Sequence, residues 1–447
     1  MQAAADPFLS ESGDLVLRTA AWYGDRQIRL PVRPAWSIEV NGPRIGVALP
    51  LSDDDIATRL TAPTGTKTLR ELAEGKKHPL IVVDDLNRPT PTARVIPTIL
   101  AELAEAGIEA SSVGIMLAPG THGAPPPDGP AKKAGDIGAR NCRLYVHDCR
   151  GETVNAGSTS FGTPILVNPL VMKSDLLIGL GGVYPNQTAG FGGGTKLALG
   201  VLGFRSIAHL HLSHTPSAWG HPDQASALRT DLDEISQRIG LRFVISLGLN
   251  ANRDVVRVDC GDPQRYYPEA VQWAREAYLS APPGTDSNVV IANAYPNDCS
   301  LTFITMKGLA PFRGAPAGAS RVVIASCPEG HGFHGLFPYG NAPKEHGREM
   351  MALRASLALR RPGRWIPKIA RRLQAEVRKH GPLESDAERP VWLYRPPGPD
   401  QPPLSERPGL KIRSNWHDIV HEVNREQGDE NLKVVLYPCS PLQYVAT

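Results

Sequence analysis

Residues 78–108, HPLIVVDDLNRPTPTARVIPTILAELAEAGI, decide the expected fold. The apolar run 78–85 predicts a buried strand, and residues 91–108 have the spacing of an amphipathic helix that ends near Gly107. This strand–helix order indicates a mostly parallel α/β sheet, in which helices cover the faces. Further apolar runs extend the pattern, at 113–119, 143–148 and 174–182.

A second α/β pattern begins after SAPPGTDS, residues 280–287, which has the composition of a linker. Strands are predicted here at 288–294, 321–327 and 431–438, and helices near 299–310, 347–360, 367–380 and 414–426. Short strands are also predicted within 14–49. We therefore expect two α/β domains with a cleft between them: a domain at 1–280, another at 288–425, and a tail at 426–447 that possibly returns to the first.

Composition and charge restrict the class of protein. The length of 447 residues, with 41% hydrophobic and 21% charged side chains, is typical of a soluble globular protein of two or three domains. A net charge of +3 gives no indication of a nucleic-acid or membrane partner. The six cysteines form no CxxC pair, and no signal peptide or membrane span is recognisable. We expect a cytoplasmic protein with reduced thiols.

Polar motifs directly follow two of the predicted strands. In DDLNRPTPT (84–92), Asp85 and Arg88 share one loop, where a guanidinium could hold a carboxylate or phosphate. In APGTHGAPPP (118–127), His122 lies on a loop and could act as a general base. The alternatives are a solvated turn and a solvent-exposed loop histidine.

A glycine-rich stretch, VYPNQTAGFGGGTKLALGVLG at 183–203, carries one lysine, Lys196. Glycines let a backbone adopt positive φ or approach a ligand closely. The order GGGTK does not satisfy the GxxxxGK[ST] phosphate loop. Lys196 could bind an anion, act as a covalent amine (a Schiff base included), or be merely solvated.

Two further motifs carry candidate side chains. In HLHLSH (209–214), His211 and His214 share a face if the segment is helical, whereas His209 and His211 do so if it is extended. No carboxylate or thiol nearby completes a metal set, so packing against core or substrate is the alternative. The segment ANAYPNDCSLTFITMKGL (292–309) contributes Tyr295, Asp298 and Lys307. Polar loops at strand ends are typical of a cleft enzyme.

In their order and spacing, DLNRPTP, PGTH, PNQTAGFGGGTK and YPNDCSL…K resemble the motifs of the nickel-dependent lactate racemase family. The resemblance implies a nickel-pincer nucleotide covalently bound to Lys196 and approached by Gly192, Gly193, Gly194 and Thr195. It implies nickel coordination by His211, with His209 as the fallback. It also implies partners: maturation enzymes that make the cofactor, and a small hydroxyacid substrate.

The same resemblance assigns roles to the remaining motif residues. Asp85 and Arg88 would position the cofactor phosphate and the substrate carboxylate, and His122 would be the first catalytic histidine. Tyr295 and Asp298 would lie at the cofactor, and Lys307 matches the family's lysine of the second domain. The implied reaction removes a hydride and a hydroxyl proton, forms a ketone, and returns the hydride to the other face.

The chain departs from the family pattern at two positions. Asn186 stands where the family has its second catalytic histidine, and Ile304 where it has a glutamine. An amide can form hydrogen bonds but cannot act as a general base at neutral pH. We therefore expect a racemase or epimerase of a 2-hydroxyacid other than lactate, in which Tyr184, His209 or His214 replaces the base or His122 acts alone. The alternatives are hydride transfer without inversion, and a non-catalytic cofactor-binding homologue.

Overall fold

The computed structural model describes residues 6–217, 219–220, 226–336 and 389–445. The chain forms two compact units, one of residues 45–278 and one of residues 1–44 with 279–447. The first 44 residues were predicted to belong to the N-terminal domain but lie in the unit of residues 279–447. The reason is that their strand β3 (Ser37–Val40) pairs with β19 (Lys433–Tyr437) near the other end of the chain. β19 therefore belongs to the unit of its neighbours in sequence. The helices predicted at 347–360 and 367–380 lie outside the described residues.

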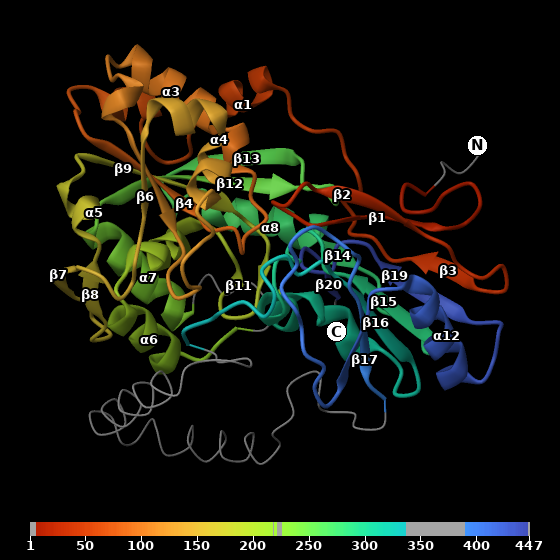
Figure 1. Ribbon diagram of the computed structural model, residues 1–447. Helices are drawn as coiled ribbons and strands as arrows, with labels where there is room; N and C mark the ends of the chain where they lie inside the picture. The colour runs from red at the N-terminus through yellow and green to blue at the C-terminus, as the bar shows by residue number, and fades with distance from the viewer. Residues whose placement is uncertain (1–5, 218, 221–225, 337–388, 446–447) are drawn as a thin grey trace. The chain divides into compact units, whose positions relative to one another are not determined.

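The unit of residues 45–278 is built on a six-stranded sheet (Figure 1). Its strand order is β13-β12-β9-β4-β5-β6, and every neighbouring pair is parallel except β12 with β13. The strands are β4 (Pro79–Asp84), β5 (Gly114–Ala118), β6 (Arg143–Val146), β9 (Leu176–Gly182), β12 (Leu241–Leu249) and β13 (Val255–Gly261). The carboxyl ends of β4, β5 and β9 consequently meet at one edge of the sheet.

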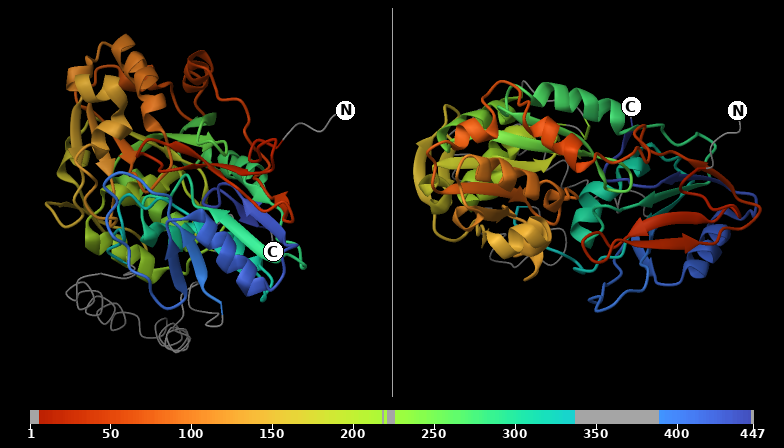
Figure 2. Two further views of the ribbon diagram at one scale, coloured as in Figure 1. Left: turned by 45° about the vertical axis from the view of Figure 1, so that its right-hand side comes forward. Right: turned by 90° about the horizontal axis from the view of Figure 1, so that it is seen from above.

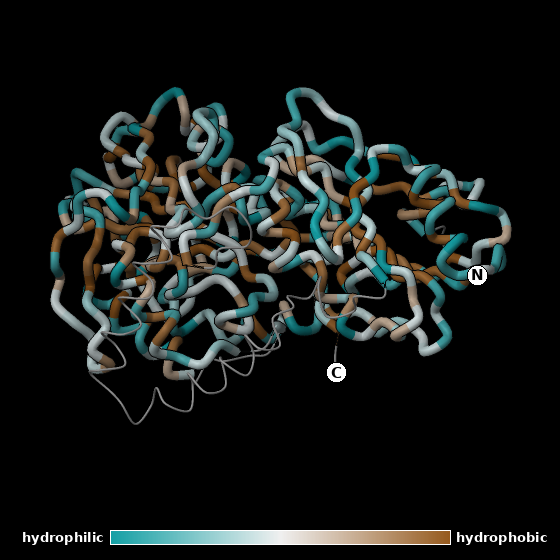
Figure 3. The backbone as a smooth tube through the Cα atoms, turned by 60° about the horizontal axis from the view of Figure 1, so that its bottom comes forward, coloured by the Kyte–Doolittle hydropathy of each residue, from teal (hydrophilic) through white to brown (hydrophobic). Residues whose placement is uncertain are grey.

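Sequence periodicity explains why this sheet and its helices form. All six residues of β4 are buried, as expected for a strand covered on both faces. Helix α3 (Ile96–Glu105) buries Ile96, Ile99, Leu100 and Leu103, which recur on one face of a helix. Burial of each such side chain stabilises the fold by roughly 1.5–3 kcal/mol. The hydrophobic segments run through the interior of the units, as Figure 3 shows by hydropathy.

The other unit has its own six-stranded sheet, and all its neighbouring strands are parallel. The order is β18-β17-β16-β15-β19-β3, so the N-terminal strands, in red, lie beside the C-terminal ones, in blue (Figure 2). The further strands are β15 (Val289–Asn293), β16 (Ser320–Ile324), β17 (Val391–Tyr394) and β18 (Leu410–Arg413). Two α/β domains with mostly parallel sheets are confirmed; a cleft between them stays a prediction.

Of the two predicted helices of this unit that fall within the described residues, one follows its predicted position and the other is irregular. Helix α12 (Trp416–Gln427) begins at its N-cap Asn415 and ends at the left-handed Gly428, where a glycine is favoured. The helix expected near 299–310 is instead a short turn at Leu301–Phe303 followed by a π-helix at Ile304–Gly308. π-helical turns are rare, and many occur at functional sites.

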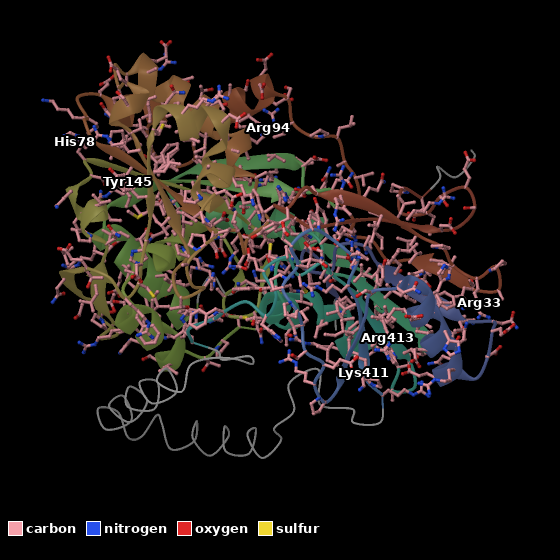
Figure 4. The ribbon with its side chains drawn as sticks, in the orientation of Figure 1. Arg33, His78, Arg94, Tyr145, Lys411 and Arg413 are labelled. Carbon is pink, nitrogen blue, oxygen red and sulfur yellow. The ribbon has the colours of Figure 1, made fainter. Side chains whose placement is uncertain are left out.

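The exterior of this unit carries ordinary charged pairs. Lys411 and Arg413, labelled in Figure 4, both pair with Glu406, at 3.2 and 2.9 Å. Such exposed pairs contribute little to stability. Within the described residues, no helix combines the length and the apolar character that a bilayer span requires.

Candidate functional site

The loops after β4 and β5 bring an aspartate and a histidine into contact. His122 Nδ1 lies 2.9 Å from Asp85 Oδ2, and the histidine side chain is 14% exposed. Asn87 donates a second hydrogen bond to the same carboxylate oxygen, at 2.9 Å. An imidazole that donates from Nδ1 to a carboxylate carries its lone pair on Nε2. The pair is therefore arranged as a general base with its orienting carboxylate.

The charge on Asp85 is strongly favoured. Burial raises the pKa of this carboxyl, but His122, Arg88 and Asn87 outweigh it and hold the pKa well below its ordinary value. The Arg88 guanidinium approaches Asp85 only to 4.0 Å and is 17% exposed. The contacts of Asp85 thus favour a role in orienting His122 over the predicted contact with cofactor phosphate. The prediction that the Arg88 guanidinium binds a carboxylate or phosphate is compatible with these contacts and stays a prediction.

A buried lysine, which the sequence analysis missed, fixes the loop that carries Asp85. Lys133 lies on α4 (Gly129–Asn141) and has no exposed surface. Its ammonium contacts Asp84 Oδ1 at 2.6 Å and the carbonyls of Arg88 and Thr90 at 3.2 and 3.0 Å. Burial lowers the pKa of Lys133 while Asp84 raises it. The position of Lys133 in a mixed helix pattern gave no signal of this role.

The glycine-rich loop runs from the hairpin of β10 (Pro185–Asn186) and β11 (Gly190–Phe191) into a 3₁₀ helix at Gly194–Val201. Gly193 and Gly194 have φ of +82° and +59°. A Cβ on Gly194 would lie 2.8 Å from the Tyr267 ring, and one on Gly192 would lie 3.3 Å from the Gly182 carbonyl. Packing against protein atoms is thus one reason for glycine at these positions, and the predicted approach of a cofactor stays a prediction.

Two side chains from α7 (Ala227–Arg238) hold the glycine-rich loop in place. Arg229 is 3% exposed and donates to the carbonyls of Gly193 and Phe191, both at 3.1 Å. Thr195, predicted to bind cofactor, donates instead to Asp233 at 2.7 Å. Lys196 therefore follows a rigid turn, and its position is set by the protein.

Helix α6 (Phe204–Ser213) carries His211, whose ring is oriented by its own backbone. His211 Nδ1 lies 2.8 Å from the Ile207 carbonyl, so Nδ1 donates and the lone pair is on Nε2. Burial, and then the positive charge of Lys196, lower the pKa of His211 to about 4, with smaller effects of His122 and His214. Lys196 and His122 thus act electrostatically on His211, and the predicted shared role of the three residues stays a prediction.

A second carboxylate–imidazole pair lies at the end of the same helix. His214 Nε2 is 2.7 Å from Asp231 Oδ2, and the two side chains are 5% and 0% exposed. Thr163 also donates to Asp231, at 2.6 Å, and its hydroxyl contacts His209 Nδ1 at 2.8 Å. His209 is two residues from His211, and such residues do not share a helix face. The geometry favours His211 over His209 as a metal ligand.

Asn186, which replaces the family's second histidine, and Tyr184, a candidate for the second base, both have other roles in the structure. The Asn186 side-chain oxygen accepts from the amides of Thr188 and Ala189, at 2.9 and 3.0 Å, and so closes a turn. Tyr184 is 4% exposed, and burial and the Asp84 carboxylate raise its pKa well above 10. Neither side chain is suited to accept a proton at neutral pH.

The predicted residues of the other unit prove mainly structural. Asp298 is fully buried and accepts from the Thr19 hydroxyl and the amides of Ala20 and Ala21, at 2.8, 2.8 and 3.0 Å, as well as from Ser326. This carboxylate fastens the N-terminal segment to the sheet, which is why the prediction that it binds cofactor was wrong.

Tyr295 and Lys307 flank the irregular helical segment of the same unit. The Tyr295 hydroxyl donates to Asp25 at 2.8 Å and the residue is 1% exposed, so it too has a structural partner. Lys307 lies in the π-helical turn, is 7% exposed, and has its ammonium 5.6 Å from the centre of the Phe303 ring. Its predicted role therefore stays a prediction.

Comparison with known proteins agrees with the motifs. Residues 23–220 match the lactate racemase N-terminal domain. The chain is similar to lactate racemases over this part. It is 27% identical to the lactate racemase of Thermoanaerobacterium thermosaccharolyticum over 304 residues, which cover 66% of this chain and 71% of that protein. It is 24% identical to the lactate racemase of Lactiplantibacillus plantarum over 293 residues, covering 64% and 68%.

Solved structures show the same fold for this lactate racemase-like chain. The lactate racemase apoprotein of T. thermosaccharolyticum superposes with a TM-score of 0.66 at 18% identity and covers 97% of this chain and 100% of its own. A Thermotoga maritima protein does so with a TM-score of 0.57 at 18% identity, covering 89% and 99%. At these identities the likeness concerns the fold alone.

The residues present fit the cofactor that the resemblance implies. His211 offers Nε2 as a neutral imidazole donor, and its Nδ1 is held by a carbonyl, as in most metal-binding histidines. Lys196 lies close enough to act on the pKa of His211. In the described part of the chain, no group of three or more His, Cys, Asp or Glu side chains could hold a metal ion. A nickel that brings most of its own ligands requires only one imidazole from the protein.

Proposed function

We propose that this lactate racemase-like chain is a racemase or epimerase of a 2-hydroxyacid that uses a nickel-pincer nucleotide bound to Lys196. The observation that carries the proposal is the Asp85–His122 pair beside Lys196 and His211. The cofactor, when bound, would accept a hydride from the carbon that bears the hydroxyl and return it to either face. This chemistry requires a base that removes the hydroxyl proton at the same time.

His122 supplies that base in the proposed reaction. Asp85 fixes the Nδ1–H tautomer, so Nε2 of His122 takes the proton of the substrate hydroxyl. Asp85 stays ionised and stabilises the imidazolium that forms. Loss of one proton and one hydride converts the hydroxyacid to a 2-oxoacid, and return of both completes inversion. Arg88, on the same loop, binds the substrate carboxylate.

Two further residues hold the cofactor in this proposal. Lys196 would form the covalent bond from the start of its 3₁₀ helix, and His211 would supply one imidazole donor to nickel through Nε2. Imidazole and soft sulfur donors both suit nickel. The proposed partners are the maturation enzymes that deliver the cofactor.

The substrate is proposed to be a 2-hydroxyacid other than lactate. The family's second histidine is replaced here by Asn186, whose side-chain oxygen closes a turn. A site that has lost this base is no longer built symmetrically around the two small enantiomers of lactate. A larger hydroxyacid or sugar acid, held by further contacts, has less need of that symmetry.

The test begins with the cofactor. The chain is co-produced with cofactor maturation enzymes, and the intact mass, the modified peptide and the nickel content are measured. We expect an adduct on Lys196 and about one nickel per chain. Lys196→Ala should lose the adduct but keep its fold by circular dichroism. Unmodified Lys196 under conditions that load a known lactate racemase would refute the cofactor assignment.

A panel of single-enantiomer 2-hydroxyacids then tests the reaction, with chiral chromatography as the measurement. Inversion of one member, lost in His122→Gln with its adduct retained, supports the racemase. A loaded protein that inverts no member and exchanges no α-hydrogen is the non-catalytic homologue. Release of a 2-oxoacid without inversion identifies the alternative hydride-transfer enzyme.

A further inference from the structure

The His214–Asp231 pair repeats the arrangement of His122 and Asp85 in the same unit. In each pair an imidazole nitrogen lies within 2.9 Å of a buried carboxylate oxygen, at 2.7 Å for His214 and 2.9 Å for His122. The two pairs use opposite ring nitrogens, since His214 donates from Nε2 and His122 from Nδ1. A neutral His214 therefore has its lone pair on Nδ1.

The surroundings of Asp231 are built to keep this orientation. Its Oδ2 atom accepts from both His214 and Thr163, and the side chain has no exposed surface. The Phe161 ring packs edge-on against the His214 ring, with centroids 5.3 Å apart. Burial raises the pKa of Asp231, but His214 and the two threonines Thr163 and Thr159 outweigh it, so the group is ionised. Because the ionised Asp231 carboxylate binds Nε2 of His214, Nδ1 is the nitrogen that can accept or give a proton.

The second nitrogen of His214, Nδ1, is the atom that the pair with Asp231 leaves available for proton transfer. Among the described residues, no group forms a hydrogen bond with His214 Nδ1. His214 is also three residues from His211, and both His214 and His122 contribute to the lowered pKa of His211. His214 is the C-cap residue of α6, so the His214–Asp231 pair lies at the end of the helix that carries the candidate metal ligand.

The other residues considered for the second proton transfer have different contacts. Asn186 is an amide in a turn, and Tyr184 is held protonated by its burial and by Asp84. His209 Nδ1 is hydrogen-bonded to the Thr163 hydroxyl, which in turn donates to Asp231, so the direct contact with this carboxylate is made by His214 and not by His209.

We propose that His214, positioned by Asp231, is the second acid–base group of the reaction and replaces the histidine that Asn186 has displaced. This inference rests on the proposed function. His122 would take the hydroxyl proton of one enantiomer as the substrate is oxidised to the 2-oxoacid. Protonated His214 would give a proton to the carbonyl oxygen as the 2-oxoacid is reduced to the other enantiomer. The reverse reaction exchanges the roles of the two histidines.

The decisive experiment is a single turnover from each enantiomer with an excess of loaded protein, quenched in acid, with the 2-oxoacid quantified. In His214→Gln, 2-oxoacid should form from one enantiomer at the wild-type rate, and from the other at least about 100-fold more slowly, the usual contribution of a general base. His122→Gln should show the opposite preference. His78→Gln, the same exchange at an exposed histidine (Figure 4), should alter neither rate.

A readout on the unloaded protein tests the positioning role of Asp231 independently of turnover. Nitrogen-15 NMR of labelled histidine should show the Nε2–H tautomer for His214 at neutral pH. Asp231→Asn should change this tautomer, because the new amide can donate as well as accept, and Asp231→Glu should restore it. An unchanged tautomer in Asp231→Asn would contradict the positioning role.

The outcomes separate this inference from the function on which it rests. If the wild-type protein inverts a hydroxyacid and His214→Gln forms 2-oxoacid equally fast from both enantiomers, only the role of His214 is overturned. If the loaded wild-type protein inverts nothing, the proposed function fails, and the role of His214 fails with it.

Discussion

His122 Nδ1 and Asp85 Oδ2 lie 2.9 Å apart, although 37 residues separate them in the chain. The contact exists because the two residues follow β4 and β5, which are neighbours in a parallel sheet and end at the same edge. It converts a loop histidine into an oriented base. The carboxylate that orients it had been expected to face a phosphate, which its negative charge would repel.

Replacement of this carboxylate should reveal its role. We expect Asp85→Asn to lower turnover of loaded protein by about 100-fold or more, because the Nδ1–H tautomer and the stabilisation of the imidazolium are lost. The adduct on Lys196 should be retained, as measured by intact mass. Asn87→Ala removes one hydrogen bond to Asp85 but leaves the charge, so its loss should be much smaller. Equal losses in the two variants would contradict an orienting role.

The buried ion pair behind the loop makes a prediction about stability. Lys133→Met leaves Asp84 as an uncompensated buried charge, which costs about 3–5 kcal/mol of unfolding free energy. The neighbouring Lys132 pairs with Asp128, which is 60% exposed, so Lys132→Met should cost no more than about 1 kcal/mol. Urea unfolding followed by circular dichroism measures both. Similar midpoints for the two variants would show that Lys133 does not hold this loop.

The glycine-rich loop allows backbone strain and crowding to be separated. Gly194 and Gly240 both have positive φ, +59° and +77°, but a Cβ meets the Tyr267 ring at 2.8 Å only at Gly194. Gly240→Ala should cost about 1 kcal/mol through the backbone alone, and Gly194→Ala about 2–4 kcal/mol because steric overlap is added. Thermal unfolding of the unloaded proteins gives the difference. A Gly194→Ala protein as stable as Gly240→Ala would mean that the ring moves freely aside.

His147 gives a prediction for pH. Its Nε2 donates to the Leu202 carbonyl at 2.9 Å and its Nδ1 accepts from Asn168 at 3.1 Å, so both nitrogens are used in the neutral form. Burial lowers the pKa of His147 below 6.5, although the Leu202 carbonyl and Asp148 oppose this. The unfolded chain therefore binds a proton first as the pH falls. The contribution of neutral His147 to the free energy of unfolding is fully present above pH 6.5. It declines below that pH, by at most about 1.4 kcal/mol per pH unit.

A variant that does not titrate isolates the contribution of His147 to the pH dependence of stability. His147→Gln, which keeps a donor and an acceptor but does not titrate, should lose less stability than the wild type between pH 7 and pH 5. Urea midpoints at pH 7, 6 and 5 measure the difference. An identical decline in both proteins would assign the acid sensitivity to other groups.

The fold could be predicted where one strand or helix carries its own signal. The run 78–85 contains β4 at Pro79–Asp84, and 431–438 contains β19 at Lys433–Tyr437, since their apolar residues are buried on both faces of a sheet. The pairing of β19 with β3 could not be predicted, because neither strand specifies its partner. This pairing is what moves residues 1–44 into the C-terminal unit.

Site residues that stand in a sequence motif could also be predicted, whereas those whose roles depend on partners far away in the sequence could not. Lys196, His122 and His211 stand in motifs of recognisable order, and Lys196 and His122 both act electrostatically on His211. Lys133 and Asp231 have no motif, because their roles depend on partners that the fold supplies. Asp298 was misassigned for the same reason: its acceptor atoms are filled by Thr19, Ala20 and Ala21, which no local pattern associates with it.

The division of the chain into 1–44, 45–278 and 279–447 has a consequence for biosynthesis. The amide of Ile45 donates to the carbonyl of Ala277 at 2.9 Å, so the middle segment closes on itself and can be completed while the ribosome is still at work. Strand β3, in contrast, emerges early and meets β19 only when translation is nearly over. At 5–20 residues per second, that delay is roughly 20–80 s. Throughout this interval the nascent N-terminus carries an unpaired strand, the kind of segment that chaperones protect.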